Sequence, residues 1–166
     1  MSMLDAIQAA RAHLETITPL KSDCGRRCAA ACCQADEGGK GGMLLFPDEE
    51  ALYDAAPSWA ELSDSGLMVF GKSIKFLICD GTCPREDRPL SCRIFPLTPI
   101  NKEGELAIEL DVRAWPVCPL MGYGMEGLSR EFVAGVHAAM ALLWAQAEGR
   151  AYIDVVTRQL SLFKSL

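Results

Sequence analysis

The spacing of apolar residues predicts helices towards both ends of the chain. Residues 3 to 17 carry an apolar residue at every third or fourth position, with charged residues between them, which is the period of one helix face. Residues 132 to 144 repeat that spacing, with Ser129 as the expected N-cap and Gly149 as the expected stop. A last helix is predicted from residue 151 to about residue 163.

The middle of the chain predicts two β-hairpins. Residues 66 to 80 contain two apolar runs around a Gly-Lys-Ser interruption, and residues 97 to 112 alternate on either side of an NKEG turn. The segment MLLF reads as a short strand, and Pro47 with the acidic residues after it predicts a helix start. With no internal repeat, these elements predict one α+β domain over residues 1–166, with terminal helices around short β-hairpins and cysteine-rich loops.

Charge and hydropathy exclude two classes of partner. The formal net charge is −6, and no cluster of Lys and Arg alternates with aromatic residues, so we expect no nucleic-acid partner. The first twenty residues lack the apolar core of a signal peptide. The most apolar stretch, residues 132 to 147, is shorter than the roughly 20 residues that span a bilayer. We therefore expect a cytoplasmic protein with no membrane partner.

Eight cysteines change this picture of an ordinary small domain, because a chain of 166 residues can bury a core without cross-links. In a reducing cytosol, clustered thiols point to a metal more than to disulfides. Both Zn²⁺ and an iron–sulfur cluster accept four thiolates from separate segments, and the sequence leaves the two open. The candidate metal ligands are Cys24, Cys28, Cys32, Cys33, Cys79, Cys83, Cys92 and Cys118.

The first four candidates lie in the segment CGRRCAAACC, residues 24 to 33. If this segment is helical, Cys24, Cys28 and Cys32 form one stripe. Cys33 lies about 100° around the helix from Cys32, so both can serve one centre only if the helix ends or unwinds there. The EGGKGG sequence just downstream makes such an end plausible.

The other four candidates follow turn and proline signals. Asp80-Gly81 is a turn signal that would fold Cys79 and Cys83 towards each other, and neighbouring prolines would keep the loops around Cys92 and Cys118 stiff. The alternative for Cys79, which follows the apolar residues FLI, is a packed core residue. Ligands are expected from both halves of the cysteine set.

The order of these motifs resembles the YkgJ-type cysteine-cluster family, whose members are described as zinc- or iron-chelating proteins. The resemblance covers about residues 24 to 120, and its most specific part is RPLSCRIFP around Cys92. Family members often have a tighter first cluster than the C-x3-C-x3-CC of this chain. The resemblance implies metal or iron–sulfur binding, and a related cysteine pattern occurs in a flagellin lysine methylase.

Arg93 is the candidate cofactor-binding residue because it directly follows Cys92. Its guanidinium could donate hydrogen bonds to thiolate or sulfide, or hold a substrate carboxylate. The alternative is a salt bridge to Glu86 or Asp87. Arg88, just before a proline, has the same two readings, of which a surface ion pair is favoured.

Two functions follow from the sequence. The first is a cysteine-thiolate protein that holds zinc, iron or an iron–sulfur centre and serves metal handling or redox sensing. The second is a metal-stabilised scaffold that acts through a protein partner. A thiol oxidoreductase would need a C-x-x-C pair, which the chain lacks, and its two histidines lie in helical patterns. An enzyme is therefore not the favoured reading.

Overall fold

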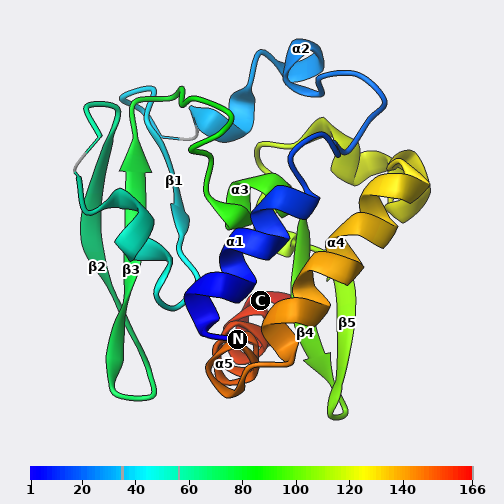
Figure 1. The fold of residues 1–166 in the computed structure, drawn as a ribbon. Helices are drawn as coiled ribbons and strands as arrows, with labels where there is room; N and C mark the ends of the chain where they lie inside the picture. Colours follow the sequence, from blue (N-terminus) through cyan, green and yellow to red (C-terminus); the bar gives the residue numbers. More distant parts are fainter. Residues whose placement is uncertain (35, 56, 166) are drawn as a thin grey trace.

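The protein has an α+β fold, as the sequence predicts. The computed structural model describes residues 1–34, 36–55 and 57–165, and Figure 1 shows helices packed beside two small antiparallel sheets. The segments that carry the first four cysteines lie at the same end of the molecule as the end of strand β3 (Lys72–Cys79). The fold therefore brings the first four cysteines and Cys79 to one end of the molecule.

Helix α1 (Met3–His13) begins with a capping box. The Ser2 hydroxyl accepts a hydrogen bond from the Asp5 N–H at 3.1 Å, and the Asp5 carboxylate accepts one from the Ser2 N–H at 2.9 Å, which satisfies two donors of the first turn. The helix ends at His13, four residues earlier than the periodicity predicts, although Leu14 remains buried in the core.

Helices α4 (Arg130–Trp144) and α5 (Ala147–Lys164) complete the helical layer. Helix α4 packs against α1, and α5 packs against α4 and strand β4. The prediction that Gly149 stops the long helix is wrong, because Gly149 lies in the first turn of α5. A Cβ atom at that position would collide with the carbonyl of Leu143, so glycine is needed there for close approach of the two helices.

Both predicted hairpins are present. Strands β1 (Gly41–Leu44), β3 and β2 (Ala60–Val69) form one antiparallel sheet in the order β1-β3-β2, and β2 and β3 are joined at Phe70-Gly71. Strands β4 (Leu97–Lys102) and β5 (Glu105–Leu110) form the second sheet. Strand β2 begins six residues before the predicted hairpin. The polar residues at its start hide the alternation of apolar and polar positions from which a strand is predicted.

Short helical segments connect these elements. The helix predicted after Pro47 is a 3-10 helix, η2, and Ala56 at the end of that prediction lies outside the described residues. Helix α3, between two prolines, was not predicted. The short segments are α2 (Gly25–Cys28), η1 (Ala31–Cys33), η2 (Glu49–Tyr53), α3 (Leu90–Ile94), η3 (Val112–Ala114), η4 (Pro119–Tyr123) and η5 (Met125–Gly127).

The main core lies between the three long helices and strand β4. Phe46 reaches it from the segment after β1 and packs on Tyr152 of α5, with ring centroids 4.8 Å apart. Leu45, the neighbour of Phe46, belongs instead to a smaller cluster with Tyr53 and Leu77 beside the sheet. In the described part of the chain, no helix is long and apolar enough to cross a bilayer.

Glu49 is a fully buried carboxylate that joins two segments. One of its oxygens accepts a hydrogen bond from the Phe46 N–H at 3.0 Å, and the other accepts one from the Leu90 N–H at 2.7 Å. Burial raises the pKa of Glu49, and the two N–H donors oppose this by lowering it. Because Leu90 is the first residue of α3, Glu49 fixes the start of the helix that carries Cys92.

Replacing Glu49 by glutamine should lower the free energy of unfolding by about 1–3 kcal/mol, because one backbone N–H would then face an amide NH2 instead of an oxygen. Urea unfolding of the variant measures the loss. The control is Glu50→Gln, at the neighbouring, partly exposed position. An equal, small effect in both variants would show that the two hydrogen bonds contribute little.

Candidate metal centre

The cysteine segment 24–33 is not one helix. Helix α2 ends at Cys28, and the next two residues, Ala29 and Ala30, have φ angles of 51° and 55°. This left-handed conformation costs about 1–2 kcal/mol for each residue other than glycine. The condition for a stripe of Cys24, Cys28 and Cys32, one continuous helix, is therefore not met, because the chain turns between the second and third of these cysteines.

Two glycines allow the backbone of Cys33 to approach the other cysteine-bearing segment. A Cβ atom on Gly41 would lie 2.5 Å from the carbonyl oxygen of Cys33, and one on Gly81 would lie 3.4 Å from the same oxygen. Gly41 is also the partner of Cys79 in the β1–β3 register. The absence of a side chain at Gly41 thus allows the close approach of Cys33, and Gly81, in the turn that joins Cys79 to Cys83, lies in van der Waals contact with the same carbonyl.

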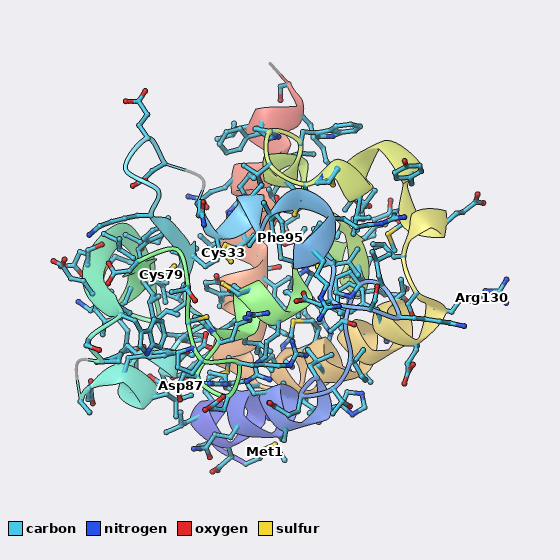
Figure 2. All side chains as sticks on the ribbon, turned by 90° about the horizontal axis from the view of Figure 1, so that it is seen from above. Met1, Cys33, Cys79, Asp87, Phe95 and Arg130 are labelled. Carbon is cyan, nitrogen blue, oxygen red and sulfur yellow. The ribbon has the colours of Figure 1, made fainter. Side chains whose placement is uncertain are left out.

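Five thiols line one hollow of about 450 Å³, which we call the thiol pocket. They come from η1, from the end of β3 with the loop after it, and from α3. Viewed from the end of the molecule that bears the cysteine segments, Cys33 and Cys79 lie near Phe95, another residue of its wall (Figure 2). The five are Cys32, Cys33, Cys79, Cys83 and Cys92.

Arg88 is one of the two arginines that line this pocket. The largest influence on Cys83 is burial, which raises its pKa, and the guanidinium of Arg88 beside it acts in the opposite direction. The pKa of Cys33 is lowered, first by the neighbouring Cys32 thiol and also by Arg88. Burial raises the pKa of Cys92 well above its usual value, and the other pocket thiols add to that effect. Arg88 therefore favours the ionised forms of Cys33 and Cys83, whereas burial opposes the ionisation of Cys92.

The remaining cysteines form a second thiol group, Cys24, Cys28 and Cys118. The Cys28 thiol lies 3.9 Å from the carbonyl oxygen of Cys24. Burial raises the pKa of Cys24 and Cys118, and nearby thiols of the same group raise it further. The pKa of the Cys32 thiol is raised, first by its contact with Cys33 and by burial, and also by Cys24 and Cys28 of this group. Cys32 lines the thiol pocket as well, so it borders both sets of thiols.

The structure thus separates the eight predicted ligands into those of the thiol pocket and those of the second thiol group. It does not bring them together in one metal site. All eight are free thiols. Among the described residues, no three Cys, His, Asp or Glu side chains are arranged so that they could hold one metal ion as they stand. The predicted metal ligation stays a prediction, but the pocket identifies which thiols could share a centre.

Arg93 is placed away from the thiol pocket, in contrast to its predicted cofactor contact. Only 6 % of its surface is exposed, and its guanidinium has five N–H donors. Each donor is matched by an acceptor of the protein. The acceptors are the carbonyl oxygens of Arg11, Arg85, Glu86 and Arg88 and the carboxylate of Glu15.

The carboxylate partner of Arg93 is also not the one that the sequence suggests. Glu15, after helix α1, forms the ion pair, and Glu86 contributes only its carbonyl oxygen. The Arg93 guanidinium lowers the pKa of Glu15. Arg93 therefore fastens the loop between Cys83 and Cys92 to α1, while the arginine beside the thiols is Arg88. The sequence marks Arg88 by its place in RPLSC, where it predicts a surface ion pair rather than a contact with the thiols.

No family model, no curated protein and no solved structure matches this chain. The resemblance to the YkgJ-type family accordingly stays a prediction from the cysteine spacing.

Exchanging Arg93 for lysine should lower the free energy of unfolding by about 2–4 kcal/mol, because an ammonium cannot serve five acceptors and leaves buried carbonyl groups unpaired. Thermal and urea unfolding measure the change. The control is Arg130→Lys, at an exposed position at the start of α4. Full stability of the Arg93→Lys protein, together with altered absorption of a bound centre, would instead support the cofactor contact expected from the sequence.

Proposed function

We propose that the protein binds a metal centre in the thiol pocket, through the thiolates of Cys33, Cys79, Cys83 and Cys92. The observation that supports this most directly is the meeting of thiols from three separate segments on one hollow. Thiolates from more than one segment are the usual ligands of both zinc and iron–sulfur centres.

The surroundings of these thiols suit such a centre. Four thiolates carry more negative charge than a divalent ion neutralises, and Arg88 lies where it offsets part of the excess. A cation next to the sulfurs favours their ionised form. The half-buried positions of the four cysteines limit water access to the metal.

The size of the hollow supports an iron–sulfur centre more than a single zinc ion. Zinc–sulfur bonds of about 2.3 Å bring four sulfurs to within about 4 Å of one another. A pocket of about 450 Å³ has room for a centre with several metal and sulfide atoms. Such a centre, when bound, supplies one-electron redox chemistry whose potential depends on nearby charges and hydrogen bonds.

The proposed role of the centre is redox sensing or metal handling. Cys32 lines the pocket and is exposed, so the hollow lies close to solvent. A purely structural centre is expected to be closed and resistant to chelators. The exposed Cys32 thiol is therefore the feature that favours an accessible centre over a metal-stabilised scaffold.

Protein purified without oxygen should be brown and should contain iron and acid-labile sulfide. Cys92→Ser and Cys33→Ser should each lose most of the metal, because a hydroxyl is a poor substitute for a thiolate ligand. Elemental analysis and visible absorption measure both results. The matched control is Cys118→Ser, from the second thiol group, which should keep its metal.

Three results bear against this proposal in different ways. Colourless protein with one zinc would replace the iron–sulfur centre by a zinc site. Equal loss of metal in Cys118→Ser and Cys92→Ser would show that ligands come from both thiol groups. Folded protein that contains no metal when purified without oxygen would refute the proposed function.

A further inference from the structure

Strand β1 forms one edge of the three-stranded sheet, whose order is β1-β3-β2. Along an edge strand, the backbone groups of every second residue point away from the sheet. Two hydrogen bonds show which residues these are. The Leu45 N–H donates to the Lys75 carbonyl of β3 at 2.9 Å. The Asp80 N–H donates to the Trp59 carbonyl at 3.0 Å, on the β2 side, so the preceding residue, Cys79, directs its backbone groups towards β1.

The register of the two strands completes the pattern. Gly41 is the β1 partner of Cys79, so residue 41 bonds to β3, as residue 45 does at the other end. Residue 43, midway between them, bonds to β3 as well, because the direction alternates along the strand. The outward-facing residues of β1 and its two ends are therefore Lys40, Gly42, Leu44 and Phe46.

Both ends of this open edge are covered. The Asp36 carboxylate accepts the Lys40 N–H at 2.6 Å, and the Asp36 N–H donates to the Lys40 carbonyl at 3.1 Å. At the other end, the Glu49 carboxylate accepts the Phe46 N–H at 3.0 Å. Folded proteins commonly cover strand edges, since an open edge is a template for another strand.

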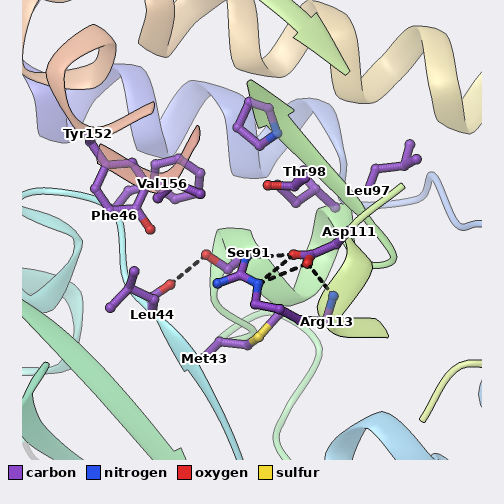
Figure 3. Close-up of a pocket in the computed structure, with 12 residues that line it drawn as sticks. Met43, Leu44, Phe46, Ser91, Leu97, Thr98, Asp111, Arg113, Tyr152 and Val156 are labelled. Carbon is purple, nitrogen blue, oxygen red and sulfur yellow. Dashed lines mark hydrogen bonds and ion pairs between the residues drawn. The ribbon is translucent and has the colours of Figure 1, made fainter. Parts of the chain in front are cut away.

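The middle of the edge is covered only in part. The Ser91 hydroxyl donates to the Leu44 carbonyl at 2.6 Å, which Figure 3 shows as a dashed line. Within the described residues, the N–H and C=O of Gly42 and the N–H of Leu44 have no hydrogen-bond partner. Gly42 is half-buried, and it lines the thiol pocket together with Leu44. The open part of the edge therefore faces the pocket.

From this pattern we infer that one residue of an extended peptide from a partner protein pairs with Gly42 inside the thiol pocket. An extended residue carries its N–H and C=O on the same side, so it can exchange two hydrogen bonds with Gly42, as residues of antiparallel strands do. The cover at Lys40 and on the Leu44 carbonyl limits the contact to a single bridge. A second copy is a poorer occupant, because its own β1 edge is covered at both ends in the same way.

The walls of the thiol pocket suit an apolar side chain on that residue. They include Trp59, Phe76 and Phe95. The volume of about 450 Å³ falls in the range of roughly 300 to 1,000 Å³ that is typical of ligand sites. The inference goes beyond the proposed function, because the groups that carry it belong to strand β1 and not to the thiols. It places the paired peptide residue beside the proposed metal centre.

The test uses a peptide probe, because a Cβ atom on Gly42 would lie 2.5 Å from the Phe76 ring and 2.7 Å from the Leu77 carbonyl oxygen, so substitution there would disturb the fold. The probe is acetyl-alanyl-phenylalanyl-alanine methylamide, titrated calorimetrically into the full chain purified without oxygen. N-methylation of its phenylalanine should weaken binding about tenfold or more, because it removes the pairing N–H. N-methylation of the following alanine, whose N–H points away from Gly42, is the matched control and should change binding less than about twofold.

Hydrogen–deuterium exchange, resolved to single residues by mass spectrometry, locates the contact. Saturating peptide should slow exchange of the Gly42 N–H about tenfold or more, because a new hydrogen bond protects it. The Lys40 N–H is the internal control, since it is already bound to Asp36, and its exchange should not change.

Three results would overturn the inference: no binding of the peptide, equal binding of the two N-methylated peptides, or binding that leaves Gly42 unprotected. Protection of Gly42 without peptide that rises with protein concentration would identify a second copy as the occupant instead. The metal content of each preparation separates this inference from the proposed function. Protein that contains metal but gains no protection at Gly42 contradicts this inference alone. Peptide-dependent protection of Gly42 in folded protein without metal contradicts the proposed function alone.

Discussion

The bonds of the Arg93 guanidinium determine where the loop between Cys83 and Cys92 can lie. That loop has little regular structure, and three of its carbonyl groups converge on this one side chain. The same guanidinium reaches the carbonyl of Arg11 and the carboxylate of Glu15. Because a buried guanidinium is costly unless all its donors are matched, the loop is held in the conformation that supplies these acceptors.

Helix α3 is fixed from two sides by buried charged groups. Glu49 binds the N–H of its first residue, Leu90, and Arg93 binds the loop before it. Cys92 lies between these two anchors. A five-residue helix cannot be stable alone, so its position in the protein depends on tertiary contacts. The direction of the Cys92 side chain is therefore set by Glu49 and Arg93, two residues that do not line the thiol pocket.

The parts of the fold that could be predicted from sequence are those with a regular hydrophobic period. The two hairpins and the long helices bury one face of each element, and the burial leaves a period of about two or 3.6 residues in the sequence. The break at Ala29 and Ala30 could not be predicted, since alanine favours a right-handed helix and only the surrounding structure holds it in the left-handed region. The role of Gly149 could not be predicted either, because it depends on the carbonyl of Leu143, six residues earlier, which only the turn between α4 and α5 brings close.

The candidate site was predictable in composition but not in grouping. Cysteine spacing named all eight thiols, yet the division into a pocket and a second group follows from the turn after Cys28 and from the approach of Gly41 to Cys33. The same limit applies to the arginines. Arg93 is next to Cys92 in the sequence, but its side chain binds carbonyl groups away from the pocket. Arg88 and Arg113, which line the pocket, are four and twenty-one residues away from Cys92.

The number of donors that each arginine has left distinguishes what these three side chains can do. Arg93 has none available, because the described acceptors match all five, and it can act only on structure. Arg88 lies beside Cys83, so its charge acts on the thiols. Arg113 lines the thiol pocket, but one edge of its guanidinium is bound to Asp111. In a chain with a net charge of −6, Asp111 already offsets the charge of Arg113, so Arg88 is the arginine of the pocket whose charge can lower the cost of burying thiolates.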